Sequence, residues 1–210
     1  MLSGETAMPK HFTEEEKKRI CQELLSTGLE LFEKYGISKT NVNDITEQVG
    51  ISKGSFYAFF ASKGDLFMEI YRLERERAHA EVFAEVTDDE HDFGYLIKKY
   101  TEKMYIRMKE SRILSIIYDF EGLKMISDKS VKERLFLFNE RTTQQLADMI
   151  QFWMERDGPY EIDAIIATKM LRSINFLRFH DYVFGMEDFE KMVGMLTEAV
   201  IDYIKDTRIK

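Results

Sequence analysis

The sequence contains very little cysteine and proline. Cys21 is the only cysteine in 210 residues, so the chain cannot form an internal disulfide, and nothing indicates a secreted protein held together by such bonds. Pro9 and Pro159 are the only prolines, and residues that favour helix dominate the composition. No stretch of alternating apolar and polar residues indicates a sheet. We therefore expect an all-α protein.

Long uncharged apolar runs are also missing. A membrane-spanning helix needs about 20 consecutive apolar residues, and no segment approaches that length. The first residues, MLSGETAMPKHFTEEEKK, lack the apolar core of a signal peptide. We expect a cytoplasmic protein that has no membrane partner.

Patterns typical of catalysis or metal binding are not found. The chain has four histidines, His11, His79, His91 and His180, and they are scattered. The spacing of His79 and His91 fits no tight metal site, so we interpret both as surface residues. No HExxH motif, phosphate-binding glycine loop or Cys-His cluster occurs. The sequence predicts no catalytic residue, no metal, no cofactor and no enzyme activity.

Acidic residues are missing from one N-terminal segment of an otherwise acidic chain. The formal net charge is -8, which argues against a broad affinity for nucleic acid. Yet GISKGSFYAFFASK, Gly50 to Lys63, contains no acid, and Lys53 and Lys63 each follow a serine. Any surface that binds nucleic acid must therefore be local.

Helix-start signals are dense near the N-terminus. Thr13 followed by Glu16 forms a capping-box pattern, and Asn41, Ser52 and Ser62 are further cap candidates. These signals predict helices over residues 13–36, 41–50, 52–60 and 63–85. Longer helices are expected over Phe93–Lys109, Ser111–Gly122, Lys129–Arg156, Ile162–Phe184 and Glu187–Lys205. The total is about nine helices.

The second and third expected helices form a helix-turn-helix pattern. One helix ends at Val49, a turn contains Gly50, and the next helix starts at Lys53. A lysine in a first helical turn opposes the helix dipole at a cost of about 0.3–1 kcal/mol, and a bound anion would reverse that sign. We therefore favour contacts with phosphate. The alternative is a plain helical hairpin whose lysines are solvated.

The segment DITEQVGISKGSFYAFFASKGDLF resembles the signature of the tetracycline-repressor (TetR) family of bacterial transcription regulators. The resemblance covers about residues 17–70. The positions that match are Ile45, Gly50, Ser52, Lys53, Gly54, Tyr57, Phe60, Lys63 and Leu66. The resemblance implies that Ser52, Lys53, Gly54, Ser55 and Ala58 face DNA bases or backbone, and that Tyr57, Lys63 and Asn41 hold phosphates. Asn41 stands where the family often has threonine.

The resemblance also implies a domain organisation. We expect a flexible leader over residues 1–12, a three-helix DNA-binding domain over 13–62, and a larger helical domain over 63–210 for ligand binding and dimerisation. The last two helices carry apolar faces, from Ile165 to Leu177 and from Phe189 to Ile204, that would pair in a homodimer. The alternative is that both faces serve the core of a single subunit.

The C-terminal domain is rich in methionine and aromatic residues that could line a pocket. The candidates are Tyr100, Met104, Met108, Ile117, Tyr118, Phe120, Phe152, Trp153, Asn175, Phe176, Arg178, Phe179 and His180. Residues 164–180 contain no acid, so Asn175, Arg178 and His180 could orient the anionic end of a mainly apolar ligand. The alternatives are that the aromatic residues form ordinary core and that the cations pair with acids on neighbouring helices.

These observations lead to a functional expectation. We expect a sequence-specific DNA-binding regulator of transcription, and specifically a repressor that binds a near-palindromic double-stranded operator as a homodimer. A small-molecule effector would modulate that binding. The alternative is a protein-interaction adaptor on the same fold that does not bind an operator.

Overall fold

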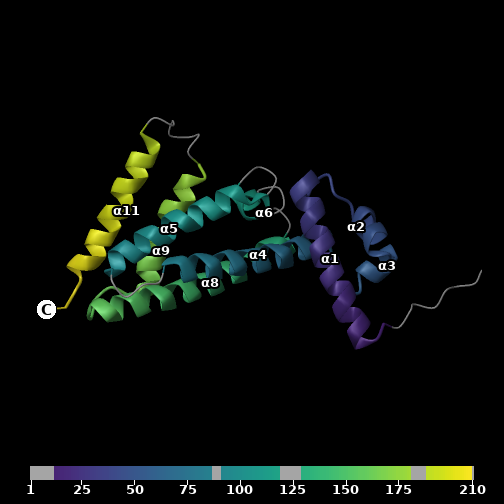
Figure 1. Ribbon diagram of the computed structural model, residues 1–210, viewed down its shortest axis with the longest axis horizontal. Coiled ribbons are helices and arrows are strands. Elements are labelled where there is room, and N and C mark those ends of the chain that lie inside the picture. The colour runs from purple at the N-terminus through teal and green to yellow at the C-terminus, as the bar shows by residue number, and fades with distance from the viewer. Residues whose placement is uncertain (1–11, 87–90, 119–128, 181–187, 210) are drawn as a thin grey trace, which may run out of the picture. The chain divides into compact units, whose positions relative to one another are not determined.

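The computed structural model describes residues 12–86, 91–118, 129–180 and 188–209 (Figure 1). Within these ranges the chain forms nine α-helices, one short 3-10 helix and no β-strand, which confirms the all-α prediction. The helices are α1 Glu14–Tyr35, α2 Val42–Val49, α3 Lys53–Phe56, α4 Lys63–Val86, α5 Phe93–Glu110, α6 Arg112–Ser115, η1 Ile116–Tyr118, α8 Lys129–Asp157, α9 Ala164–Arg178 and α11 Phe189–Asp206. None of them is long and apolar enough to cross a membrane.

The chain divides into two compact units, Met1–Tyr71 and Arg72–Lys210. This division falls inside α4, whereas the sequence placed the domain boundary at the start of that helix. The proposed domains, 13–62 and 63–210, therefore differ from the compact units by the first turns of α4. Most of the expected leader, residues 1–11, lies outside the described residues.

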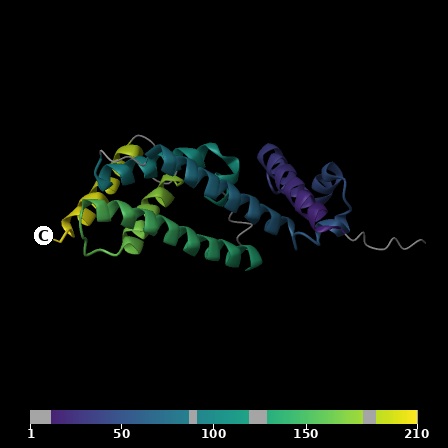
Figure 2. The same ribbon diagram turned by 60° about the horizontal axis from the view of Figure 1, so that its bottom comes forward.

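The N-terminal unit contains α1, α2, α3 and the start of α4 (Figure 1, Figure 2). The Thr13 hydroxyl accepts a hydrogen bond from the Glu16 N–H (3.2 Å), and the Glu16 carboxylate accepts one from the Thr13 N–H (2.8 Å). This geometry confirms the predicted capping box at the start of α1. The buried side chains of α1 recur at helical spacing and comprise Ile20, Leu24, Leu31 and Phe32.

The turn between α2 and α3 is built on Gly50. Its φ of 74° lies in the left-handed region, and residues that have a Cβ adopt this backbone conformation only with strain. Ser52 then caps α3, because its hydroxyl accepts a hydrogen bond from the Ser55 N–H (3.0 Å). Helix α3 is shorter than expected, since it ends at Phe56 rather than near Phe60. After Phe56 the chain tightens into a turn, in which the Phe59 N–H donates to the Phe56 carbonyl (2.9 Å).

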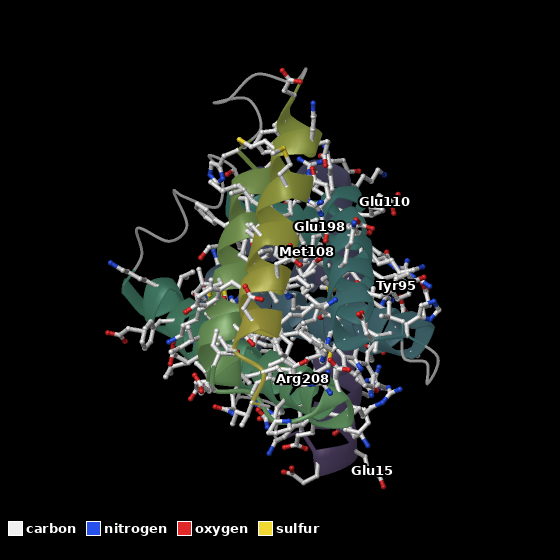
Figure 3. All side chains as sticks on the ribbon, turned by 90° about the vertical axis from the view of Figure 1, so that its left-hand side faces the viewer. Glu15, Tyr95, Met108, Glu110, Glu198 and Arg208 are labelled. Atoms are coloured by element: carbon white, nitrogen blue, oxygen red, sulfur yellow. The ribbon has the colours of Figure 1, made fainter. Side chains whose placement is uncertain are left out.

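In the C-terminal unit, α5 packs against α8, α9 and α11, while α9 packs against both α8 and α11. Ion pairs join α5 to α11: Lys98 pairs with Glu198, which Figure 3 labels, and Asp92 pairs with Lys205 at 2.8 Å. The end of α11 is tied to the segment after α8, since the Ile209 N–H donates to the Pro159 carbonyl (2.9 Å). These contacts hold α11 against α5 and against the segment between α8 and α9.

Three predicted helices of the C-terminal unit needed correction. The helix expected over residues 111–122 is two short elements, α6 and η1, and residues 119–128 lie outside the described ranges. Helix α9 starts at Ala164 because the Asp163 carboxylate caps it, accepting a hydrogen bond from the Ile165 N–H (2.6 Å). Helix α9 ends at Arg178 rather than Phe184, and residues 181–187 lie outside the described ranges. Helix α11 starts at Phe189 rather than Glu187.

The turn geometry predicts the effect of replacing Gly50. Gly50→Ala should lower the free energy of unfolding by about 1–2 kcal/mol, because the new Cβ disfavours the left-handed backbone. No neighbouring atom lies within 4 Å of that Cβ, so the cost is purely conformational. Urea denaturation measures the change. Gly54→Ala is the matched control, since Gly54 lies inside α3 without positive φ, and equal losses in both variants would contradict this explanation.

Candidate functional site

The start of α3 presents a small exposed surface. Ser52, Lys53, Gly54 and Ala58 are exposed, and the Tyr57 side chain is 50% exposed. We call these five residues the α3 surface. Ser55 is half-buried beside them, and its hydroxyl lies 2.9 Å from the Ser52 hydroxyl. The structure thus brings together six of the residues predicted to contact DNA.

The α3 surface is held by burial on the opposite side of the helix. Phe56 is fully buried, and its ring lies 5.4 Å from that of Tyr57 and 6.0 Å from that of Phe60. Phe56 is fixed in the core, whereas Lys53, Gly54 and Tyr57 are exposed. The aromatic residues of the segment therefore have two roles: Phe56 packs, whereas Tyr57 faces solvent.

Charge makes the α3 surface suitable for an anion. The nearest acid in the sequence before it is Glu47, and the nearest after it, Asp65, is only 3% exposed. Lys53 is exposed, and no ion pair or hydrogen bond of its side chain is found among the described residues. The first N–H groups of α3, hydroxyl groups and one cation are the donors that commonly hold DNA phosphates.

Lys63 has a structural role that the sequence did not reveal. Its ammonium donates to the backbone carbonyls of Ile37 (2.5 Å) and Thr40 (2.7 Å), in the connection between α1 and α2. These acceptors precede Lys63 by more than twenty positions, so local sequence gave no signal of the contact. Lys63 thus ties the start of α4 to the α1–α2 connection. Its phosphate contact stays a prediction.

Asn41 lies at the start of α2 and is exposed. Its backbone N–H donates to the Asp44 carboxylate at 2.7 Å, as expected for an acid at the third helical position. The carboxylate of Asp44 is also exposed and would repel a phosphate close to this helix start. The environment of Asn41 is therefore less favourable to an anion than that of the α3 surface.

Among the cavities formed by the described residues of the C-terminal unit, three bear on ligand binding. The first, which we call the apolar cavity, has a volume of only about 30 Å³ and lies among α5, α8 and α9. The second, the polar cavity, has about 260 Å³ and is lined by Arg75, Glu76, His79, Tyr100, Phe138, Thr142, Gln145 and Leu146. The third, the outer cavity, has about 480 Å³ and is lined by residues of η1, α8 and α9. The apolar cavity shares Tyr100 and Leu146 with the polar cavity and Arg172 with the outer cavity.

The cavities gather only some of the predicted ligand residues. Tyr100, Trp153 and Asn175 line the apolar cavity, and Ile117, Tyr118 and Phe176 line the outer cavity. Met104 and Met108 are buried in the core, and Phe152 is 51% exposed. Phe120 lies outside the described residues. The apolar cavity is small, because about 30 Å³ holds roughly one water molecule, and the ligand pocket among these residues stays a prediction.

The cations of α9 follow the expected pairing with acids on neighbouring helices only in part, since Arg178 lies near Glu190 of α11. Arg172 donates to Thr143 and to both the backbone carbonyl and the side-chain amide oxygen of Asn139, so it binds neutral groups on α8. Arg178 is 7% exposed and lies over the Tyr105 ring, 4.9 Å from its centroid, with Glu190 at 3.9 Å. His180 bonds the Phe176 carbonyl at 2.9 Å. Of the predicted anion-binding trio, Asn175 lines the apolar cavity, whereas Arg178 and His180 line none of the three cavities described above.

Sequence reasoning missed the polar group formed by Arg75, His79 and Tyr100. His79 is half-buried rather than a surface residue, and its Nδ1 lies 2.7 Å from the Tyr100 hydroxyl. Burial, helped by the nearby charge of Arg75, lowers the pKa of His79, so the imidazole is neutral at pH 7. Burial likewise raises the pKa of Tyr100, which stays protonated. The signal in the sequence was the spacing of four between Arg75 and His79, which places both on one face of α4.

The part of the chain that the structure describes contains no cluster of three or more histidine, cysteine or acidic side chains suited to a metal ion. Cys21 is half-buried, and burial raises the pKa of its thiol, which lowers its reactivity. The two surfaces with distinct chemistry are therefore the α3 surface and the polar cavity.

The residues of the α3 surface fall inside a segment that matches a known protein family. Residues 24–70 match the model described as bacterial regulatory proteins, tetR family. The transcriptional regulator AcrR of Shigella flexneri is 36% identical over 61 residues, which cover 29% of this chain and 28% of that protein. The "Probable acrEF/envCD operon repressor" of Escherichia coli is 28% identical over 149 residues, 66% of each chain. The matched regions thus span less than two thirds of these relatives.

Solved structures share the fold over nearly the whole chain. The regulator FadR of Bacillus subtilis, solved in complex with stearoyl-CoA, superposes with a TM-score of 0.62 over 86% of this chain and 97% of its own. The fatty acid degradation regulator FadR of Bacillus halodurans gives a TM-score of 0.61 over 91% and 97%. Sequence identities of 12% and 13% make both a likeness of fold alone.

The two lysines of the helix-turn-helix should differ in their effect on stability. Lys63→Met should lower the free energy of unfolding by about 1–3 kcal/mol, because two buried carbonyls lose a charged donor. Lys53→Met should leave stability unchanged, since Lys53 is exposed and makes no such bonds. Thermal and urea denaturation of both variants provides the comparison. Equal stability of the two variants would show that Lys63 does not hold the α1–α2 connection.

Proposed function

We propose, for this member of the tetR family of bacterial transcriptional regulators, a repressor that binds a near-palindromic DNA operator as a homodimer. The observation that carries this proposal is the exposed, acid-free α3 surface at the start of a capped helix. A helix start of this kind supplies free N–H groups to phosphates and admits small side chains to the major groove. The matched E. coli relative is itself described as an operon repressor, which supports the direction of regulation.

Each residue of the proposed interface has a chemical role. Lys53 and the Tyr57 hydroxyl would contact phosphates, and Ser52, Gly54 and Ala58 would approach base edges or backbone. Phosphate contacts supply affinity and position, whereas base contacts supply sequence preference. The negative net charge of the whole chain limits binding elsewhere on its surface.

The alternative function is a protein-interaction adaptor that keeps the fold but has no operator. Such an adaptor needs no exposed cation at a helix start. The presence of Lys53 and Tyr57 together favours DNA binding over this alternative. A gel-shift assay at several salt concentrations separates the two, because binding to phosphates weakens steeply with salt.

The surface proposed for dimerisation lies on α9 and α11. Part of each predicted apolar face serves the subunit core, since Ile174, Phe189 and Val193 form a buried cluster. Other members remain outside, and the exposed apolar side chains of the two helices are Ile166 (54%), Phe176 (53%), Met195 (65%), Leu196 (38%) and Tyr203 (54%). Gly194 faces open space beside them, so a second helix could approach closely. Two such helices from each subunit would form a four-helix interface.

The proposed regulation is by a small effector bound in the C-terminal unit. The polar cavity and the outer cavity are large enough to admit part of a small molecule, while the apolar cavity would have to widen. The B. subtilis neighbour was solved with stearoyl-CoA, which shows that this fold can bind an amphipathic ligand. An effector changes DNA affinity only through its different affinities for the conformations of the protein.

Operator binding should depend on Lys53 and Tyr57. Lys53→Met should weaken binding to every DNA sequence and reduce the slope of log affinity against log salt by about 1, as for one lost phosphate contact. Tyr57→Phe should weaken binding without affecting the fold, because the ring contact with Phe56 is kept. Lys132→Met, an exposed substitution on α8, is the control. An unchanged salt slope for Lys53→Met would remove Lys53 from the interface.

Dimerisation should depend on the exposed apolar residues of α11. Met195→Glu should shift sedimentation from a dimer toward the 24.9 kDa monomer, because a charge would be buried in the interface. The side chain is 65% exposed in the subunit, so folding should be unaffected. Ile106→Glu on α5 is a matched control with 51% exposure. A wild-type protein that is monomeric at micromolar concentration would contradict the proposed interface.

A further inference from the structure

The two lysines that start α3 and α4 lie in different surroundings. The Lys53 side chain is exposed, whereas Lys63 is half-buried. The Lys63 ammonium donates to the carbonyls of Ile37 (2.5 Å) and Thr40 (2.7 Å), so these acceptors engage two of its three N–H groups. Hydrogen bonds from a charged donor are stronger than neutral ones. A DNA phosphate would therefore compete at Lys63 with contacts inside the protein, whereas Lys53 makes no such contact with the residues that the structure describes.

Thr40 belongs to a tightly held connection. It is 1% exposed, and its hydroxyl donates to the Gly36 carbonyl at the end of α1 (2.8 Å). The peptide bond to Asn41 is trans, so the Thr40 carbonyl and the Asn41 N–H point in opposite directions. The carbonyl is bound by Lys63, and the N–H is bound by the carboxylate of Asp44 in the first turn of α2 (2.7 Å). Lys63 thus fixes one side of the peptide group at which α2 begins.

The start of α4 gives Lys63 a rigid base. The Ser62 hydroxyl accepts a hydrogen bond from the Asp65 N–H (3.1 Å), which caps the first turn. Leu66 is fully buried and packs against Gly28 of α1, where an added Cβ would lie 3.0 Å from the Leu66 Cδ2. The Lys63 side chain therefore joins two segments, the start of α4 and the α1–α2 connection, that both rest on α1.

Helix α2 transmits this position to α3. It packs against α1 and contacts α3. The turn between α2 and α3 is short, and within it the Ile51 N–H donates to the Thr46 carbonyl (3.0 Å). A shift at the start of α2 would therefore move the α3 surface as well. Hydrogen bonds to base edges need precise placement, whereas the attraction between a cation and the phosphate chain tolerates small shifts.

We propose that Lys63 is a positioning residue for operator recognition, which holds the start of α2 and thereby the orientation of the α3 surface, rather than a ligand of phosphate. This inference rests on the proposed function and deepens it, because it assigns part of the sequence preference to a side chain that does not touch DNA. It takes the place of the phosphate contact predicted for Lys63. Lys53 remains the cation that contacts phosphate.

The test compares Lys63→Met with Lys53→Met in the full chain. Two DNA duplexes of equal length, the operator recovered by selection and an unrelated sequence, are each titrated at several salt concentrations. Lys63→Met should weaken operator binding roughly tenfold and unrelated binding much less, with an unchanged slope of log affinity against log salt. Lys53→Met should weaken binding to both duplexes alike and reduce the slope by about 1. Circular dichroism establishes a temperature at which both variants are folded.

A second variant, Lys63→Gln, keeps N–H donors without the charge and serves where Lys63→Met does not fold. An unchanged salt slope, together with a smaller ratio of operator affinity to unrelated affinity, supports the positioning role. A slope reduced by about 1 in either Lys63 variant shows a phosphate ligand. A wild-type affinity ratio in every folded Lys63 variant shows a contribution to stability alone. Each of the last two results overturns the inference.

Failure of the proposed function gives a different result. A wild-type protein that prefers no DNA sequence would contradict operator binding, and this inference with it. That result appears before any variant is compared, whereas a failure of the positioning role appears only in the Lys63 variants.

Discussion

The position of α3 depends on the burial of Phe56. A helix of four residues cannot be stable alone, because helix nucleation is unfavourable and only propagation repays it. Phe56 is fully buried among aromatic neighbours and fixes the helix from one side, while Gly50 and Ser52 fix where the chain enters it. Because Phe56, Gly50 and Ser52 fix the position of α3, Lys53 and Tyr57 face solvent. The proposed DNA surface is therefore a consequence of core packing.

Features determined by neighbours in sequence could be predicted. Thr13 and Glu16 exchange two hydrogen bonds across a single turn, and the Ser52 hydroxyl caps α3. Residue type and spacing were therefore sufficient to predict both helix starts. The glycine turn at Gly50 followed from its conformational freedom in the same way. The fold class followed from composition and helical periodicity. The length of α3 did not, because a tight turn after Phe56 competes with continued helix in a segment with no strong stop signal.

Features that depend on distant partners could not be predicted. The carbonyls bound by Lys63 lie on the connection between two earlier helices, and the partners of Arg172 lie on another helix. His79 looked like a surface residue because its partner, Tyr100, is on α5. Cavities are still less predictable, since a volume is what remains after all side chains have packed. The aromatic content of the C-terminal unit suggested a pocket, yet rings such as Tyr100 and Trp153 are buried in the core, while Phe152 and Phe176 are exposed.

The central claim is that the α3 surface reads a specific DNA sequence in a symmetric dimer. Selection of bound sequences from a random pool of double-stranded DNA tests this most directly. The account predicts enrichment of one near-palindromic sequence, whose half-sites lie about 34–36 Å apart or a multiple of that distance. Recovery of no enriched sequence, at a salt concentration where the protein is folded, would contradict operator binding and favour the adaptor.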